Sequence, residues 1–327
     1  MKKLKYTAIA FLALSGTHSL FAYAFDNQFN ISGGFRHDQI SAHDLITFGA
    51  PFGGASWMKD KFSVNHIDMG QVGFDFRLLM PETDFFCEYP CISNLYLTGS
   101  ADWAWNDGSH YKRSITNFAA GGAVVSTFST HGKLKTTSAD DFQVGLGYRL
   151  FEDELWAFNV IGGYSYNKQD FSTSHGFTSI SGGAFAEDPL YEGLKFKQLW
   201  QGGWLGLEAF YDWFGWLFHF GYEYHYANYH LNINIPGIST TLAEDFSNTR
   251  NSHRGQGNVA YLITSYRFCN DVEVGVDFAF KDFRTRHGSI KPKGESFDDL
   301  GYPAGTSGNA KGKWSSYSIV GNVGYNF

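Results

Sequence analysis

The last eleven residues of the chain, YSIVGNVGYNF at positions 317–327, alternate between two kinds of side chain. One set is mostly apolar or aromatic: Tyr317, Ile319, Gly321, Val323, Tyr325 and Phe327. The set between them is mostly small or polar: Ser318, Val320, Asn322, Gly324 and Asn326. A period of two indicates a β-strand, because successive side chains point to opposite faces. The apolar face of such a strand contacts either the core of a soluble sandwich or the lipid around a transmembrane barrel.

The same alternation recurs along the chain, and no long window shows the helical period of 3.6 residues. In the segment 216–232, the residues at six alternate positions, 216 to 226, are all aromatic and therefore face one side of the strand. Such an aromatic face is hard to accommodate except against lipid and its interfaces. An even number of strands suits antiparallel closure with both termini at one end. We therefore predict an all-β fold, a ten-stranded antiparallel transmembrane β-barrel. Its strands are expected at 28–40, 62–80, 92–106, 140–150, 155–167, 196–212, 216–232, 257–268, 272–282 and 314–327.

The connections between these segments alternate between short and long. Three are tight turns, at 151–154, 213–214 and 269–271, and the one at 81–91 is somewhat longer. Outer-membrane barrels combine short periplasmic turns with long external loops. The sequence therefore predicts which end of the barrel faces the periplasm. The long loops are expected at 41–61, 107–139, 168–195, 233–256 and 283–313.

The composition agrees with a barrel and excludes other classes. The chain of 327 residues is 43% hydrophobic and 18% aromatic, which is too apolar for a disordered protein. Outside the N-terminus it has no apolar stretch of about 18 residues, which excludes a helical membrane protein. The 38 glycines fit a narrow lumen, where several of them face inward, while most aromatic residues face lipid.

The N-terminus has the pattern of a secretory signal. A basic segment at 1–5 precedes a mostly apolar segment at 6–21, and Ala22-Tyr23-Ala24 has the small-x-small form of a cleavage site. We assign residues 1–24 to a signal peptide and residues 25–327 to a single barrel domain. Removing the signal takes away three lysines and moves the net charge from −7 to −10, so a nucleic-acid partner is not expected.

Three cysteines remain in the exported chain. Cys87 and Cys91 are close enough in sequence to close a small disulfide ring, which would leave Cys269 unpaired or bonded to a partner molecule. No second cysteine pair and no nearby histidine has metal-ligand spacing, so we expect no metal site. The expected topology places all three cysteines at the periplasmic end.

Several strand sequences resemble the omptins, ten-stranded outer-membrane barrels whose enzymatic members are surface proteases. The resemblance covers nearly the whole mature chain in strand order and loop size, although each matched piece is short. The matching pieces are Ile31-Ser32-Gly33-Gly34-Phe35, residues 74–81, residues 197–207 with 222–224, Asp271-Val272-Glu273-Val274, and the closing Gly324-Tyr325-Asn326-Phe327.

The catalytic signature of the omptin proteases is missing. Those enzymes carry a D-x-D pattern in the second external loop and an acid beside a histidine in the fourth, which together activate a water molecule. Here neither pattern is present in the corresponding loops, and no catalytic residue is carried over. The weak candidates for an endopeptidase are Asp102, Asp107 and His230.

The chain is also similar to the Protochlamydia outer membrane protein family, barrels that are thought to act as porins or envelope components. This likeness rests on the signal peptide, the aromatic richness, the cysteines at the periplasmic side and the overall length. It implies a non-proteolytic barrel in the outer membrane of a Gram-negative-type bacterium.

Parity places ten ionisable side chains on the lumen side of the strands. A narrow lumen requires mutually satisfied polar groups, because an unpaired buried charge is costly. Barrels of about eight to ten strands are largely filled by side chains, whereas wide aqueous channels have about 16 to 18 strands. We therefore expect a salt-bridged plug near the periplasmic end. The ten residues are Asp75, Arg77, Arg149, Glu208, His219, Glu223, His225, Arg267, Glu273 and Asp277.

Two pairings follow from the expected turns. A two-residue loop at 213–214 would set Glu208 directly opposite His219, where a carboxylate beside an imidazole could also transfer protons. A turn centred on Asn270 would set Arg267 opposite Glu273.

These observations predict a porin-like or structural surface protein, without a soluble cofactor. The alternatives are an omptin-like endopeptidase and an adhesin that acts through its long external loops. The expected partners are outer-membrane lipid, lipopolysaccharide, a possible disulfide partner at Cys269, and the barrel-assembly machinery. That machinery would read a C-terminal signal formed by Tyr325 and Phe327.

Overall fold

The structure is a computed structural model, and it describes residues 27–52, 55–80, 94–106, 108–187, 193–234, 253–268, 270–285, 288–289 and 307–327. All regular structure in these ranges is β-strand. None of these residues belongs to a helix long and apolar enough to cross a membrane. The predicted signal peptide at 1–24 and the three cysteines lie outside the described residues.

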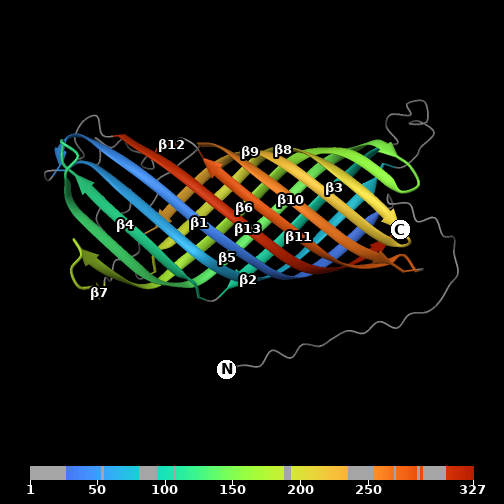
Figure 1. The fold of residues 1–327 in the computed structure, drawn as a ribbon, viewed down its shortest axis with the longest axis horizontal. Coiled ribbons are helices and arrows are strands. Elements are labelled where there is room, and N and C mark those ends of the chain that lie inside the picture. Colours follow the sequence, from blue (N-terminus) through green and yellow to red (C-terminus); the bar gives the residue numbers. More distant parts are fainter. Residues whose placement is uncertain are drawn as a thin grey trace, which may run out of the picture.

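Ten antiparallel strands close into a barrel, as predicted (Figure 1). The first strand pairs with the last, from Gln28 opposite Asn326 to Thr47 opposite Ser307, so no edge is left open. The barrel strands are β1 (Gln28–Phe52), β2 (Ala55–Leu79), β3 (Leu95–Asn106), β5 (Val124–Glu152), β6 (Trp156–Ile180), β8 (Lys195–Trp213), β9 (Trp216–Asn234), β10 (His253–Arg267), β11 (Val272–Thr285) and β13 (Ser307–Asn326).

Three short strands complete the sheet. β4 (His110–Phe118) lies between β2 and β5 and continues the line of β3 towards the external end. β7 (Ala186–Glu187) pairs with β6, and β12 (Gly288–Ser289) pairs with β13.

Much of what we predicted to be external loop is strand, so that part of the prediction is wrong. The range 41–61 consists largely of the ends of β1 and β2, 107–139 holds β4 and the start of β5, and β6 runs through most of the first half of 168–195. Of the other two ranges, 235–252 and 290–306 lie outside the described residues. β1, β2, β5 and β6 therefore continue beyond their predicted ends and form tall hairpins.

We call the half of the barrel that contains the predicted periplasmic turns its lower half, and the other half its upper half. Apolar side chains cover the outer face of the lower half. On β9, Phe220, Tyr222, Tyr224 and Tyr226 are 44–52% exposed, and the outward side chains of β11 and β13 are similarly apolar. Above this band, lysines such as Lys61, Lys133, Lys197 and Lys311 are exposed on the outer face instead. The lower half therefore has the outward apolar parity predicted for contact with lipid.

Above the band the pattern inverts, and apolar side chains point into the lumen. Trp200 and Trp314 are completely buried there, and twenty buried residues form one cluster. The outside of the hairpins is polar because it contacts water, and the inside is apolar because the facing strands pack on one another. The cluster consists of Ile40, Ala42, Phe62, Val64, Ile67, Met69, Ala104, Tyr111, Leu134, Ala139, Phe171, Leu194, Phe196, Trp200, Ala227, Tyr229, Leu231, Val259, Phe283 and Trp314.

A β-bulge in β2 helps to produce this inversion. Asp38 pairs with Ile67, but Ile40 pairs with Val64, so two residues of β2 lie opposite Gln39. One of them, His66, has a φ of 60°. Because the extra residue shifts the alternation by one, Ile67 faces inward below the bulge and Val64 faces inward above it.

The turn between β8 and β9 differs from the predicted one. Trp213 pairs with Trp216, so the two-residue loop is Phe214-Gly215, and both residues have positive φ, at 52° and 81°. Positive φ at both positions is the geometry that matches the twist of a hairpin. The predicted register is therefore wrong by two residues, and Glu208 pairs with Gly221.

Inward glycines make room for inward aromatic rings on the neighbouring strand. Gly257 pairs with Phe283, and a Cβ on that glycine would lie 2.3 Å from the phenyl ring. Gly221 pairs with Tyr261, and its Cβ would lie 1.9 Å from the phenol. These two inward glycines are thus explained by cross-strand packing of an aromatic ring against a residue that has no side chain.

We predict that Gly257→Ala destabilises the barrel by about 1 to 3 kcal/mol, because the methyl group would overpack the aromatic core. Denaturant unfolding of the refolded protein in detergent micelles measures the change. The matched control is Gly321→Ala on β13, where the nearest atom to an added Cβ is 3.9 Å away. Equal stability of the two variants would contradict the packing role of Gly257.

Candidate functional site: the barrel lumen

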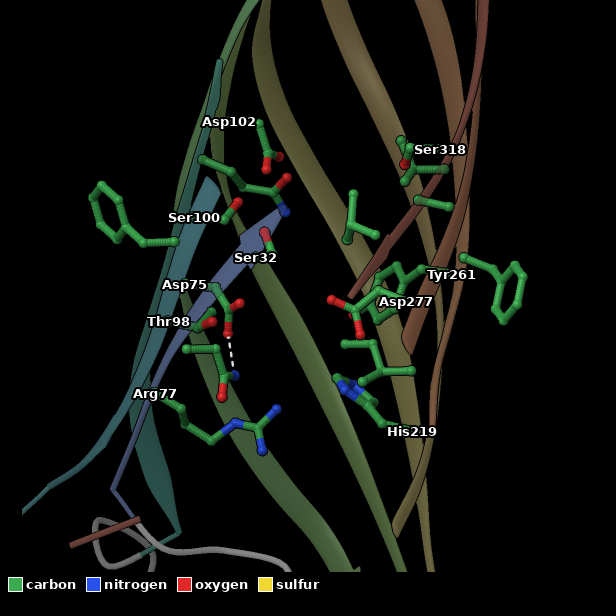
Figure 2. Close-up of a pocket in the computed structure, with 18 of the residues that line it drawn as sticks. Ser32, Asp75, Arg77, Thr98, Ser100, Asp102, His219, Tyr261, Asp277 and Ser318 are labelled. Carbon is green, nitrogen blue, oxygen red and sulfur yellow. Dashed lines mark hydrogen bonds between the residues drawn. The ribbon is translucent and has the colours of Figure 1, made fainter. Parts of the chain in front are cut away.

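The lower half of the lumen holds a cavity of about 210 Å³, lined mainly by polar side chains from opposite walls (Figure 2). The inward parity predicted for the lower strands places them there. Buried charges in and around the cavity form hydrogen-bonded clusters, centred on Glu208, Glu273, Arg36 and Glu223.

The first group surrounds Glu208 on β8. Its carboxylate accepts hydrogen bonds from the phenols of Tyr96 (2.6 Å) and Tyr261 (2.9 Å). His219 Nε2 lies 2.9 Å from the same carboxylate, so the two predicted partners are in contact although their strands pair in a different register. The carboxylate is only 6% exposed, and these donors compensate the loss of its hydration.

Arg77 adds a cation to this group. Its guanidinium lies over the ring of Phe210 at 4.5 Å, and its Nη2 is 3.8 Å from Glu208 Oε1. Arg149 is not part of the group, because it binds Glu152 beside the turn between β5 and β6.

A second carboxylate, Glu273, is bound where the first and last strands meet. It accepts hydrogen bonds from Gln28 Nε2 (3.0 Å), Ser265 Oγ (3.1 Å) and Asn326 Nδ2 (2.9 Å), and Arg267 Nη2 lies at 2.7 Å. Arg267 and Glu273 are direct cross-strand partners, as the turn around Asn270 predicted. This cluster joins four strands at the seam of the barrel near its periplasmic end.

The upper group is centred on Arg36, which is 1% exposed. Its guanidinium binds Asp38 through Nε (2.9 Å) and Asp141 through Nη1 (2.9 Å). Lys281 Nζ also reaches Asp141 at 2.7 Å, and Trp314 Nε1 donates to Asp38 at 3.1 Å. The group lies directly beneath the aromatic core and is connected to it through Trp314.

Sequence reasoning missed Arg36, Asp38, Asp141 and Lys281. Each of them continues the inward parity of a predicted strand, as Lys281 does after Asp277. The same alternation would have found them if it had been extended to the upper ends of those strands.

Glu223 and His225 form a smaller cluster beside the cavity. His225 Nε2 lies 2.8 Å from Glu223, and its Nδ1 lies 2.9 Å from Ser165 Oγ. The order serine, imidazole and carboxylate is that of a hydrolase triad. Ser165, however, is 1% exposed and does not line the cavity, so we assign the cluster a packing role.

Three aspartates line the cavity with carboxamides as their hydrogen-bond partners. Figure 2 shows Asp75 and Asp277 pointing into the lumen from opposite walls, with Asp102 above them. The pairs are Asp75 with Asn30 (2.7 Å), Asp102 with Gln71 (3.0 Å) and Asp277 with Asn322.

The weak catalytic candidates are not brought together. Asp102 faces the lumen, whereas His230 lies between the inward Tyr229 and Leu231, so its side chain points to the outside. Asp107 lies outside the described residues. Among the residues that the structure describes, no three His, Cys, Asp or Glu side chains are grouped to bind a metal ion directly.

We predict that Arg36→Met destabilises the barrel by about 3 to 5 kcal/mol, because it leaves buried carboxylates without their cation. Arg284→Met is the control, since that side chain is 57% exposed on the outer face and should change stability by less than about 1 kcal/mol. Denaturant unfolding compares the two, and a loss below about 1 kcal/mol for Arg36→Met would contradict the role of this group.

Two carboxylates oppose each other above the lipid-facing band. Asp44 on β1 pairs with Asp60 on β2, and Arg113 on β4 binds Asp60. Burial, with the charge of Asp60 as the next cause, raises the pKa of Asp44 from 3.8 to about 7. The neutral acid is therefore the form that suits the folded barrel.

A raised pKa in the folded state means that Asp44 favours folding at pH values below about 4 and loses that contribution as the pH rises to about 7. We predict that Asp44→Asn is more stable than the wild type by about 1 to 2 kcal/mol at pH 8, and that the difference shrinks at pH 4. Unfolding at both pH values measures it. Asp170→Asn on the outer face should show no such pH-dependent gain, and a pH-independent effect of Asp44→Asn would refute the assignment.

Comparisons with known proteins agree with the fold. The family model of the Protochlamydia outer membrane proteins matches residues 30–327. No curated protein matches the chain. Among solved structures, the outer membrane protease OmpT from Escherichia coli matches with a TM-score of 0.62 at 11% identity, covering 92% of this chain and 97% of that one. At this identity the likeness shows a shared barrel fold alone.

Two further solved structures match more loosely. OprG from Pseudomonas aeruginosa has a TM-score of 0.30 at 11% identity, covering 92% of this chain and 97% of that one. The transport unit of the autotransporter AIDA-I from Escherichia coli has a TM-score of 0.30 at 9% identity, covering 95% of this chain and 93% of that one.

Proposed function

The chain belongs to the Protochlamydia outer membrane protein family, and on that premise we propose that it serves as a closed, structural surface barrel. It is a β-barrel of the outer membrane. The proposal concerns what this barrel does there: it stabilises the surface of the envelope and does not conduct solutes.

The observation that supports closure is the aromatic core above the lipid-facing band. Every one of the ten barrel strands contributes at least one buried side chain to it. Trp200, Tyr229 and Phe283 are each at most 1% exposed, and their ring centroids lie 4.4 Å (Trp200 to Tyr229) and 5.5 Å (Trp200 to Phe283) apart. A hydrated solute would have to lose its water to enter such a packed apolar layer.

The charged groups below the core support the same conclusion. The predicted plug at the periplasmic end has counterparts in the clusters around Glu208 and Glu273, and the group around Arg36 adds a further layer. Barrels of about ten strands have interiors that side chains largely fill. A porin-like function would need the aromatic core to open, because the narrow polar layers below it restrict the lumen without sealing it.

The two alternatives have less support. The endopeptidase would rest on a shared fold, because Asp102 and His230 point to opposite sides of the barrel wall. An adhesin would use the polar outer faces of the tall hairpins, and no described feature of those faces favours a particular ligand.

We also propose that the outward band contacts lipid and lipopolysaccharide and that the barrel-assembly machinery reads the C-terminus. Tyr325 and Phe327 are 52% and 62% exposed on the outer face, with their rings stacked at 6.4 Å. Exposed aromatic side chains at this end suit both an interfacial girdle and a recognition signal.

The experiment for closure is single-channel recording in a planar bilayer. The wild type should give no steady conductance steps, and Arg267→Ala alone should remain silent because the aromatic core stays in place. The triple variant Trp200→Ala, Tyr229→Ala, Phe283→Ala should conduct, because it removes adjoining rings from the core.

The matched control is the outward triple variant Phe220→Ala, Tyr222→Ala, Tyr224→Ala, which removes as many rings from the lipid-facing side and should remain silent. Folding of each variant is checked by its mobility shift on heating. Regular conductance steps from the wild type would overturn the proposal of a closed barrel.

A further inference from the structure

We propose that a cationic cluster on the outer face, where the first strand meets the last, binds the phosphate group of an outer-leaflet lipid and so ties the seam of the barrel together. This site rests on the proposed contact of the outward band with lipid, and it extends that contact from the acyl chains to the head groups. The cluster consists of His43, Lys59, Lys61, Arg284, Lys311 and Lys313.

Three of these bases occupy one row across three strands that lie side by side (Figure 1). His43 on β1 pairs with Lys61 on β2 and with Lys311 on β13. Neighbouring strands are about 4.8 Å apart, so the backbones of the two lysines are about 10 Å apart. Like charges that lie opposite each other in a sheet are destabilising. The row therefore places mutually repelling bases at the point where the barrel closes.

Three further cations border this row. Lys59 lies two residues above the row on β2, Lys313 lies two residues below it on β13, and Arg284 on β11 pairs with Lys313. In the part of the chain that the structure describes, the carboxylate in contact with the cluster is Asp282, which lies 2.7 Å from Arg284 Nη2 and 3.9 Å from Lys313 Nζ. The cluster thus has an excess of positive charge.

This positive potential acts on the imidazole at its centre. Burial, followed by the charges of Lys61, Lys59 and Lys311, lowers the pKa of His43 below its usual value, while Asp60 acts in the opposite direction. The same potential attracts an anion, which would relieve the repulsion between the bases.

The cluster lies at the height of the lipid head groups. Tyr317 is the last outward aromatic residue of β13 below the cluster, and it is 47% exposed. Lys313 follows four residues further up, about 14 Å along a strand tilted by about 40°, which is about 10 Å in height. Outward aromatic rings lie at the edge of the hydrocarbon, and lysine side chains can extend along the wall towards the head groups. Lipid phosphates are therefore within reach of the cluster.

Phosphate is the anion that suits this arrangement. Its oxygens accept charge-assisted hydrogen bonds from several donors at once, so one group can bind bases from adjacent strands. The backbone beneath the row is held in place, because the inward residues Ala42, Phe62 and Gly312 pair with one another and are buried. A phosphate over His43 would replace the repulsion between β2, β1 and β13 with shared contacts.

The test of binding is native mass spectrometry of the full chain in a neutral detergent. The chain is titrated with phosphatidic acid, with phosphatidylcholine of the same acyl chains, and with inorganic phosphate. Phosphatidic acid should bind at least about tenfold more tightly than the other two. The double variant Lys61→Gln, Lys311→Gln should bind phosphatidic acid about tenfold more weakly and phosphatidylcholine as the wild type does.

The test of the seam is denaturant unfolding from phosphatidylcholine vesicles with and without phosphatidic acid. Phosphatidic acid should raise the unfolding midpoint of the wild type and raise that of the double variant much less. Without phosphatidic acid the double variant should be at least as stable as the wild type, because the repulsion across the seam is removed.

The matched control is Lys133→Gln, Lys197→Gln, which removes two exposed lysines from the outer faces of β5 and β8 and should respond to phosphatidic acid as the wild type does. Equal loss of response in both double variants, equal binding of the two lipids, or equally tight binding of inorganic phosphate would overturn the proposal. Failure of the wild type to insert into phosphatidylcholine vesicles would instead contradict the lipid contact of the outward band, and the conductance test of closure is independent of both.

Discussion

The wall of this barrel is one strand thick, and every residue in it must suit the environment on its own side. Around the lower half the outside is lipid, so Phe220 and Tyr222 face outward while Glu223 and His219 face the lumen. Around the upper half the outside is water, so Lys61 and Lys311 face outward and Phe62 and Trp314 face inward. The same alternation thus produces a polar lumen below and an apolar core above.

The two halves depend on each other where they meet. Arg36 and Asp38 form the top of the polar half, and Trp314 of the aromatic core donates to Asp38 and lies under the guanidinium at 5.4 Å. The bulge at His66 lies at the same height on β2 and shifts the parity of that strand. A closed lumen follows from this junction, because the apolar layer seals what the narrow polar layers below it only restrict.

The period-two pattern was enough to predict ten strands, their order, their outward faces and the pairing of Arg267 with Glu273. It failed for the hairpins in 41–61, 107–139 and 168–195, because lysine and serine residues there are typical of loops, although inward residues such as Tyr111, Leu134 and Phe171 alternate with them. The predicted register of β8 with β9 is also wrong, because Trp213 pairs with Trp216 and the turn is formed by Phe214-Gly215, which have the positive φ values that it requires.

By itself, the sequence determined the alternation, and therefore which side chains of each strand lie on the same side of the barrel wall. Only the tertiary structure decided which of them meet: that Tyr96 and Tyr261 converge on Glu208 from different strands, and that Asp75 and Asp277 share a cavity from opposite walls. The physical reason is that parity is a property of one strand, whereas contacts across a closed barrel depend on the stagger and tilt of all ten strands.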